Sequence, residues 1–138
     1  MILCDTGPLV AVLDPRQGEI HERCVSFLRG LSEGLVTTWP CLTEAMYLAY
    51  KIGGFPLQEA LARLIASDVF EIQHLEKTSV ARIETLMRRY TNVPMDFADA
   101  ALFVSAELRG IRRIFTLDND FRIYRFDDGG YFDVVPES

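Results

Sequence analysis

The sequence has few of the residues that build disulfide or zinc sites. Its three cysteines are scattered at Cys4, Cys24 and Cys41 without CxxC spacing, and only two histidines are present. We therefore expect neither a disulfide framework nor a cysteine–histidine zinc centre. No apolar run is long enough to cross a bilayer, and no basic segment precedes a long apolar run at the start. These absences predict a reduced, cytoplasmic protein with no membrane segment.

Several common catalytic motifs are also missing. The pair Gly53-Gly54 does not fit a phosphate-binding P-loop, and no GxGxxG follows the first apolar run. Ser–His–Asp catalysis would need a placed histidine, and His21 and His74 are more typical of surface positions. The segment 5–8 lacks the second aspartate of a haloacid-dehalogenase-like phosphatase and the adjacent acids of a receiver domain. The remaining candidates for chemistry are carboxylates.

The formal net charge of −6 argues against a protein that coats nucleic acid by bulk attraction. Lys51 and Lys77 are the only lysines, and the arginines concentrate late in the chain. Guanidinium groups suit phosphate recognition, so our candidates for phosphate contacts are Arg112, Arg113 and Arg122. The open alternative is that such arginines are solvated helix ends.

Strand-like and helix-like segments alternate along the chain. We predict strands at 2–4, 35–38, 69–72, 113–117 and 131–135, and helices at 8–13, 19–31, 40–53, 56–65, 80–90 and 97–109. The last helix should bury a stripe of Phe97, Ala101, Val104 and Leu108 and end at Gly110. This alternation predicts one α/β domain spanning residues 1–138, with a mainly parallel sheet of four to five strands covered on both faces.

The segment 93–101 joins a proline to two aspartates that open an alanine-rich helix. Asp96 is a preferred N-cap residue, and Asp99 can reach back to it as the acid of a capping box does. From this segment alone, capping and chemistry are equally good interpretations.

Acids from distant parts of the sequence are predicted to meet at one rim of the sheet. Asp5 and Asp118 each end a predicted strand, whereas Glu44, Asp96 and Asp99 lie in the first turns of helices. Strand carboxyl ends and the helices that follow them share a rim in parallel sheets. Clustered carboxylates are unfavourable without a cation, and hard oxygen ligands suit Mg²⁺ or Mn²⁺. The alternative at each position is an ordinary turn-starting aspartate.

Four ordered sequence blocks resemble the PIN domain family, and in particular its VapC-like toxins. They are Leu3-Cys4-Asp5-Thr6, Leu42-Thr43-Glu44-Ala45, Asp96-Phe97-Ala98-Asp99-Ala100-Ala101 and Thr116-Leu117-Asp118-Asn119-Asp120-Phe121. The resemblance covers essentially the whole chain and implies a three-layer α/β/α fold.

The resemblance also implies roles for individual residues. Metal-binding and catalytic acids would be Asp5, Glu44, Asp99 and Asp118, with Asp96 and Asp120 as accessory ligands for a second ion, and Thr6 and Thr116 as substrate-orienting hydroxyls. With Mg²⁺ or Mn²⁺ bound, such a protein would be an endoribonuclease that cleaves tRNA or rRNA. The family alternatives are a housekeeping RNA-processing nuclease and a catalytically weak binding module.

Partners follow from the same resemblance. A VapC-like toxin would be a homodimer held inactive by a small antitoxin in an apolar groove. Groove candidates are Met46, Tyr47, Tyr50 and Phe55, for which ordinary core positions are the alternative. We expect the aromatic group of Trp39, Tyr47, Tyr50 and Phe55 to serve as core or interface rather than as a base-stacking platform.

Overall fold

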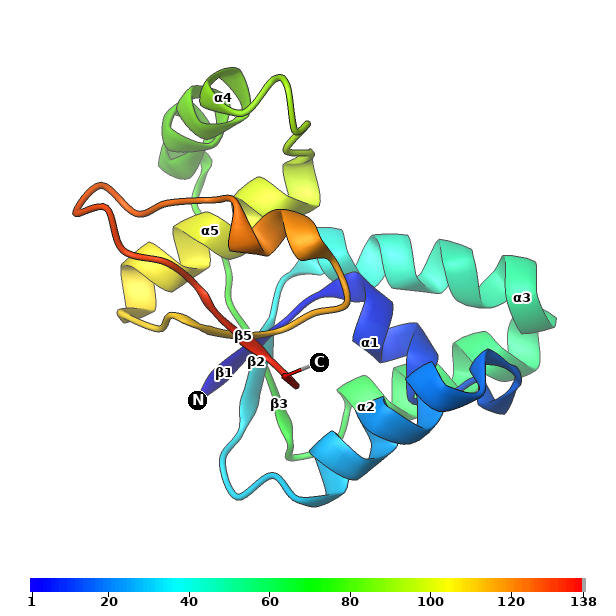
Figure 1. Ribbon diagram of the computed structural model, residues 1–138. Helices are drawn as coiled ribbons and strands as arrows, with labels where there is room; N and C mark the ends of the chain where they lie inside the picture. Colours follow the sequence, from blue (N-terminus) through cyan, green and yellow to red (C-terminus); the bar gives the residue numbers. More distant parts are fainter. Residues whose placement is uncertain (138) are drawn as a thin grey trace.

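A five-stranded parallel sheet forms the centre of the computed structural model, which describes residues 1–137 (Figure 1). The strands are β1 (Ile2–Cys4), β2 (Leu35–Thr37), β3 (Phe70–Ile72), β4 (Arg113–Phe115) and β5 (Asp133–Val135). Their order across the sheet is β3-β2-β1-β4-β5. All five predicted strands are confirmed, and each is only three residues long.

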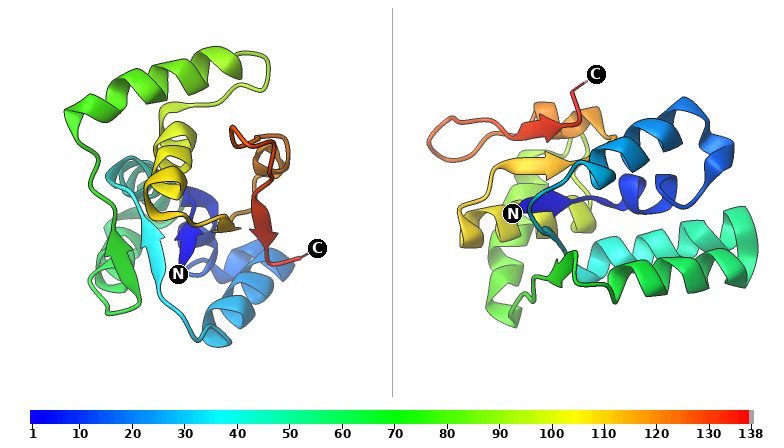
Figure 2. Two further views of the ribbon diagram at one scale, coloured as in Figure 1. Left: turned by 90° about the vertical axis from the view of Figure 1, so that its left-hand side faces the viewer. Right: turned by 90° about the horizontal axis from the view of Figure 1, so that it is seen from below.

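Helices cover both faces of this sheet (Figure 2). They are α1 (Thr6–Ala11), α2 (Glu19–Arg29), α3 (Trp39–Ile65), α4 (Val80–Arg89) and α5 (Phe97–Arg109), with short 3₁₀ turns η1 (Pro15–Gln17), η2 (Lys77–Ser79) and η3 (Asn119–Arg122). Within residues 1–137, none of these helices has the length and apolarity needed to cross a bilayer. The predicted three-layer α/β/α arrangement is confirmed.

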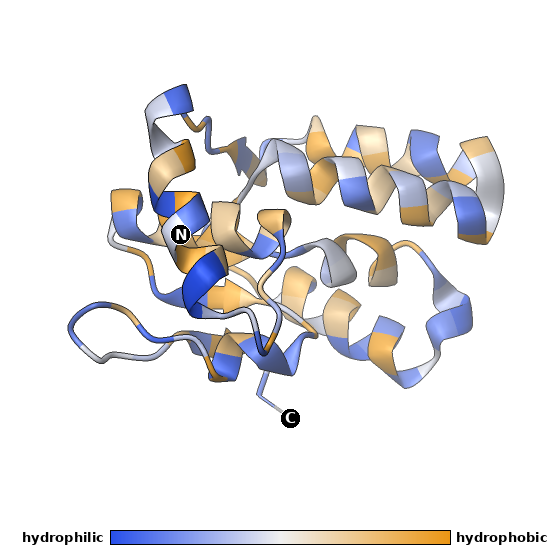
Figure 3. Ribbon diagram, turned by 90° about the horizontal axis from the view of Figure 1, so that it is seen from above, coloured by the Kyte–Doolittle hydropathy of each residue, from blue (hydrophilic) through white to orange (hydrophobic). Residues whose placement is uncertain are grey.

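The strands divide the core into two apolar clusters. Leu3 of β1 points into a cluster with α4 and α5, whereas its neighbours Ile2 and Cys4 point into a cluster with α1, α2 and α3. This alternation follows from the two-residue period of a strand, which sends successive side chains to opposite faces. Figure 3 shows hydrophobic segments gathered around the sheet and hydrophilic ones on the outer loops.

The α3 segment is a helical hairpin. Gly54 has φ +67° and ψ −160°, a backbone conformation that interrupts the helix and that glycine adopts without steric cost. The second half runs back beside the first (Figures 1 and 2), and the Gln58 side-chain amide donates to the Met46 carbonyl at 3.1 Å. The predicted helices on either side of Gly53-Gly54 are therefore confirmed as two arms of one hairpin.

The predicted burial of α5 needs correction. The helix does end at Gly110 in the left-handed conformation, as expected. Its buried surface, however, is the continuous run 98–106, while Phe97 and Leu108 are 50% and 61% exposed. The reason is that α5 lies between the sheet and α4, so most of its circumference faces protein and small alanines allow the close approach.

Two predicted helix ends also differ. The first helix ends at Ala11 and not at Leu13, since Val12 already occupies its C-cap. The second helix ends at Arg29 and not at residue 31, with Gly30 at its C-cap.

A pair of identical substitutions tests the burial of α5. Leu102→Ala removes a fully buried side chain and should lower the free energy of unfolding by about 2–5 kcal/mol. Leu108→Ala, on the exposed side of the same helix, should change it by less than about 0.5 kcal/mol. Urea unfolding measures both changes in the free energy of unfolding. Equal decreases for the two variants would contradict the burial of Leu102 and the exposure of Leu108.

Candidate metal centre

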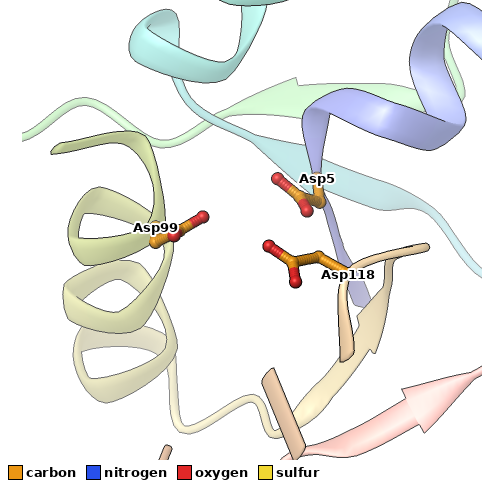
Figure 4. Close-up of side chains that lie close together, drawn as sticks. All are labelled: Asp5, Asp99 and Asp118. Atoms are coloured by element: carbon orange, nitrogen blue, oxygen red, sulfur yellow. The ribbon is translucent and has the colours of Figure 1, made fainter. Parts of the chain in front are cut away.

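Three carboxylates meet at the carboxyl-terminal rim of the sheet. Asp5 directly follows β1, Asp118 lies just beyond β4, and Asp99 is in the first turn of α5. One carboxylate oxygen from each lies within 4.8 Å of the others. Figure 4 shows the side chains directed into a common space from three separate elements. The predicted convergence is therefore present for these three acids.

Each of these acids is also part of a helix start. Asp5 is the N-cap of α1, and its Oδ1 accepts from the Thr6 amide at 2.8 Å. Asp118 caps η3, with Oδ1 accepting from the Asp120 amide at 2.9 Å. Asp96 and Asp99 form the predicted capping box at the start of α5. Local backbone requirements therefore fix the positions of the carboxylates.

The two predicted threonines hold acids in place. Thr116 Oγ1 donates to Asp5 Oδ2 at 2.7 Å and accepts from the Asp118 amide at 2.9 Å. Thr6 Oγ1 lies 3.2 Å from both the Glu44 carboxylate and the Cys41 carbonyl, each of which can accept its proton. Thr116 thus links β1 to β4, and Thr6 links the start of α1 to α3.

Burial of the acids changes their protonation. Desolvation raises the pKa of Asp5 to about 6, against hydrogen bonds from Thr116 and Thr6 that lower it. Desolvation and the neighbouring charges of Asp96 and Asp5 raise the pKa of Asp99 to about 8. Both shifts mean that the ionised cluster is costly without a compensating cation.

The oxygen donors fit a hard divalent ion. Among the described residues, no hydrogen bond engages Asp99 Oδ1 or Asp118 Oδ2, so each keeps an oxygen available for coordination. No cysteine or histidine belongs to the group of potential ligands found among those residues. An all-carboxylate set of this kind suits Mg²⁺ or Mn²⁺ better than zinc.

Tyr124 is a site residue that sequence reasoning missed. It is fully buried, and its hydroxyl donates to Asp99 Oδ2 at 3.2 Å. Burial and the charge of Asp99 raise its pKa, so the hydroxyl stays protonated as a donor. Its ring packs edge-on against Tyr90 and Phe121. The segment after η3 has no helical or strand periodicity, so no sequence signal pointed to this residue.

The other predicted acids lie around the three-carboxylate cluster. Glu44 and Asp96 are exposed and line the same cavity of about 280 Å³ as the cluster. Asp120 follows Asp118 in η3, and burial together with the Asp118 charge raises its pKa. Glu44 is thus placed beside the cluster and not within it.

The structure separates the three predicted arginines. Arg112 and Arg113 lie at the amino-terminal end of β4, the opposite end from Asp118, and are paired with Asp128 and with Glu33. Arg122, in η3, is exposed and lies on the same side as the acids. Of the three, Arg122 is therefore the one that lies in the segment directly after a clustered acid, Asp118.

Of the two expectations for the aromatic group, core or interface, the core position is wrong, and the interface stays a prediction. Trp39, Tyr47, Tyr50 and Phe55 are 54%, 61%, 60% and 65% exposed, respectively. All four belong to the α3 hairpin and lie on its exposed surface. Met46, in contrast, is half-buried against the cluster formed with α1 and α2, so the core alternative holds for this groove candidate.

Comparison with known proteins agrees with this geometry. The PIN domain family model matches residues 2–127. Ribonuclease VapC26 of Mycobacterium tuberculosis is 26% identical over 136 residues, covering 98% of this chain and 100% of the relative. The crystal structure of M. tuberculosis VapC20, described as a Sarcin-Ricin loop cleaving toxin, superposes with a TM-score of 0.82 at 20% identity, over 99% of this chain and 100% of the other.

A chain of a toxin–antitoxin complex from Klebsiella pneumoniae has a TM-score of 0.67 at 18% identity, over 99% of this chain and 97% of the other. These likenesses extend over essentially the whole chain, and the family match includes Asp5, Asp99 and Asp118. The chain belongs to the PIN domain family, and within that family it resembles the VapC ribonucleases.

Proposed function

We propose that this protein is a metal-dependent endoribonuclease that hydrolyses phosphodiester bonds in RNA and acts as the toxin of a toxin–antitoxin pair. The observation that carries the proposal is the cluster of Asp5, Asp99 and Asp118, whose oxygens lie within 4.8 Å on a PIN fold. The likeness to a ribonuclease along the full chain supports the same activity.

In this proposal Asp5, Asp99 and Asp118 hold Mg²⁺ or Mn²⁺, with Glu44, Asp96 and Asp120 as accessory acids. Such a cation lowers the pKa of water and neutralises charge on the scissile phosphate. Our proposed site thus needs no histidine, and no hydrogen bond links His21 or His74 to the acids among the described residues.

Buried hydrogen-bond donors orient the carboxylates of the proposed site. Thr116 fixes one oxygen of Asp5, and Tyr124 fixes one oxygen of Asp99. Because these donors are buried, the carboxylates keep their orientation when substrate displaces water. Arg122 is the predicted arginine that we place against the RNA backbone, and Thr6 positions Glu44.

The proposal extends to substrate and partners. We propose tRNA or rRNA as substrate, a small antitoxin as inhibitor, a homodimer as the assembly and the cytoplasm as the location. The toxin–antitoxin complex from K. pneumoniae supports the inhibitor. The complete acidic cluster argues against a catalytically weak binding module, because such a module has no need to retain three costly carboxylates.

Single isosteric substitutions test the site. Asp99→Asn or Asp118→Asn should lower Mg²⁺- or Mn²⁺-dependent RNA cleavage by more than about 100-fold, since even outer partners of metal ligands contribute about 10- to 100-fold. Asp68→Asn, on an exposed turn, is the control and should cleave normally. Cleavage at the wild-type rate by folded Asp99→Asn protein would refute the assignment.

Growth separates a toxin from a housekeeping nuclease. Expression of the wild-type chain should arrest growth of the host, and co-expression of the small neighbouring gene product should relieve the arrest. The Asp118→Asn variant should not arrest growth. Normal growth with active, soluble wild-type protein would favour RNA processing as the function.

The raised pKa values predict how pH affects the metal-free protein. In the folded protein the pKa values of Asp5 and Asp99 are about 6 and 8, whereas in the unfolded chain both are 3.8. The folded protein therefore binds these two protons more tightly. Stability should therefore fall as pH rises from about 4 to about 8, because the unfolded chain gives up its protons first. The ion-paired acids, whose pKa values are lowered, act in the opposite direction, because the stability that they contribute is lost as pH falls.

Thermal unfolding in a chelator should show a melting temperature lower by at least about 5 °C at pH 8 than at pH 5. Mg²⁺ or Mn²⁺ should raise the melting temperature more at pH 8, since binding at pH 5 must displace protons. Asp99→Asn should weaken both effects. A melting temperature that rises from pH 5 to pH 8 without metal would contradict the prediction.

A further inference from the structure

An open cavity of about 740 Å³ adjoins the acidic cluster. Its lining includes the aromatic side chains of Trp39, Tyr47 and Phe97. Glu44 and Asp96 line both this cavity and the smaller one that contains the three carboxylates. A molecule bound at the cluster can therefore continue directly into the aromatic cavity.

The three aromatic side chains leave much of their surface open. Trp39, Tyr47 and Phe97 are 54%, 61% and 50% exposed. Trp39 and Phe97 are the first residues of α3 and α5, whose amino-terminal ends lie at the same rim of the sheet (Figure 1), and Tyr47 lies two turns further along α3. A single exposed aromatic residue is ordinary, but three around one cavity form an apolar surface that suits a planar ligand.

The indole ring of Trp39 is held in position without being covered. Its Nε1 donates to His74 Nδ1 at 3.3 Å, and the two rings are tilted by 54° at a centroid distance of 6.1 Å. The ring thus has a fixed orientation before any ligand binds, which reduces the entropy lost on binding.

The charges around the cavity favour a base over a phosphate inside it. Glu44 and Asp96 contribute negative charge, and no lysine or arginine lines the cavity. One turn beyond Tyr47, Lys51 places its Nζ 5.3 Å from the Tyr47 ring centroid. Helix rise puts Lys51 roughly 10 Å along α3 from Glu44. A cation therefore stands on the far side of the aromatic surface from the acids.

We propose that this cavity is a nucleobase subsite, in which an unpaired base next to the cleaved phosphate stacks on Trp39, Tyr47 and Phe97. The inference deepens the ribonuclease function proposed above and rests on it. Stacking needs a base whose face is accessible, so the substrate at this point is single-stranded or has a base turned out of a helix. Lys51 would meet the following phosphate.

The position of the cavity favours RNA over a protein segment as its occupant. Phe97 also lines a second hollow, which has Val80, Ile83, Met87 and Met95 in its lining and, among the described residues, shares none with the cavity of the three acids. Aliphatic side chains of this kind suit a protein partner. The aromatic cavity, in contrast, shares residues with the acidic site, which favours its use by substrate.

Trp39 is the only tryptophan, so its fluorescence reports directly on the proposed subsite. A short single-stranded oligoadenylate, titrated into the full-length protein in Mg²⁺ on a timescale shorter than cleavage, should quench this emission saturably. A ribose-phosphate oligomer of the same length without bases should quench it far less. Equal quenching by both oligomers would overturn the proposal, because stacking requires the base.

Variants locate the contact. Tyr47→Ala or Phe97→Ala should raise the midpoint of the quenching titration roughly 5- to 150-fold, which corresponds to about 1–3 kcal/mol per stacked base. Tyr47→Phe keeps the ring and should retain binding. Tyr50→Ala is the matched control, since Tyr50 is 60% exposed on the same helix but does not line the cavity. If Tyr50→Ala raised the titration midpoint as much as Tyr47→Ala, the proposal would be overturned.

Cleavage assays separate this proposal from the one on which it rests. If the base-dependent quenching and its variant pattern appear but the protein cleaves no RNA with Mg²⁺ or Mn²⁺, the subsite stands and the nuclease assignment fails. If RNA is cleaved and Tyr47→Ala and Phe97→Ala cleave normally, the subsite fails and the nuclease stands. If these variants weaken only antitoxin binding, the cavity is a protein interface and the proposal is wrong.

Discussion

Asp5, Asp99 and Asp118 bring three carboxylates within 4.8 Å of one another, and folding must overcome their repulsion. Two unit charges 4 Å apart repel by about 4 kcal/mol at an effective dielectric constant of 20. Protonation removes part of this repulsion, and burial and the neighbouring charges favour the protonated form, so that the pKa values of Asp5 and Asp99 are raised. Packing supplies the rest, because the buried run 98–106 fixes α5 against the sheet while β1 and β4 pair directly. Packing of the core thus offsets the electrostatic cost of the acidic site.

The same acids satisfy local needs of the backbone, which explains how so short a chain carries so costly a site. Asp5, Asp96 and Asp118 each cap a helix or 3₁₀ turn, and Asp99 completes the capping box. Amide donors and the positive end of the helix dipole favour negative charge at these positions. Helix capping and metal binding, which compete as interpretations of the sequence, are therefore compatible in the structure, because the same carboxylate positions suit both. In the site that we propose, Asp99 serves both through different oxygen atoms, since Oδ2 accepts hydrogen bonds and, among residues 1–137, none reaches Oδ1.

Patterns local in the sequence predicted most of the fold and the centre of the site. Strand positions, the break at Gly54 and the capping box all depend on neighbouring residues, and the structure confirms them. What failed depends on packing between distant segments. Phe97 and Leu108 fit a helical stripe, yet the neighbours of α5 bury other residues. Tyr124 reaches Asp99 from a segment without periodicity. The metal-binding role of Glu44, in contrast, stays a prediction: this residue follows the motif and lines the same cavity as the three acids.

The arginines show how an acidic chain can still be organised for RNA. Four of them neutralise acids away from the rim: Arg82 with Glu107 and Asp127, Arg109 with Glu71, Arg112 with Asp128, and Arg113 with Glu33 and Asp133. These pairs stabilise loops and helix ends and add little general attraction for a polyanion. In the function and subsite that we propose, RNA binding at the rim therefore depends on local contacts, namely a cation among the acids, Arg122, and aromatic surface that carries no charge. Affinity built in this way selects for the shape of the RNA more than for its total charge.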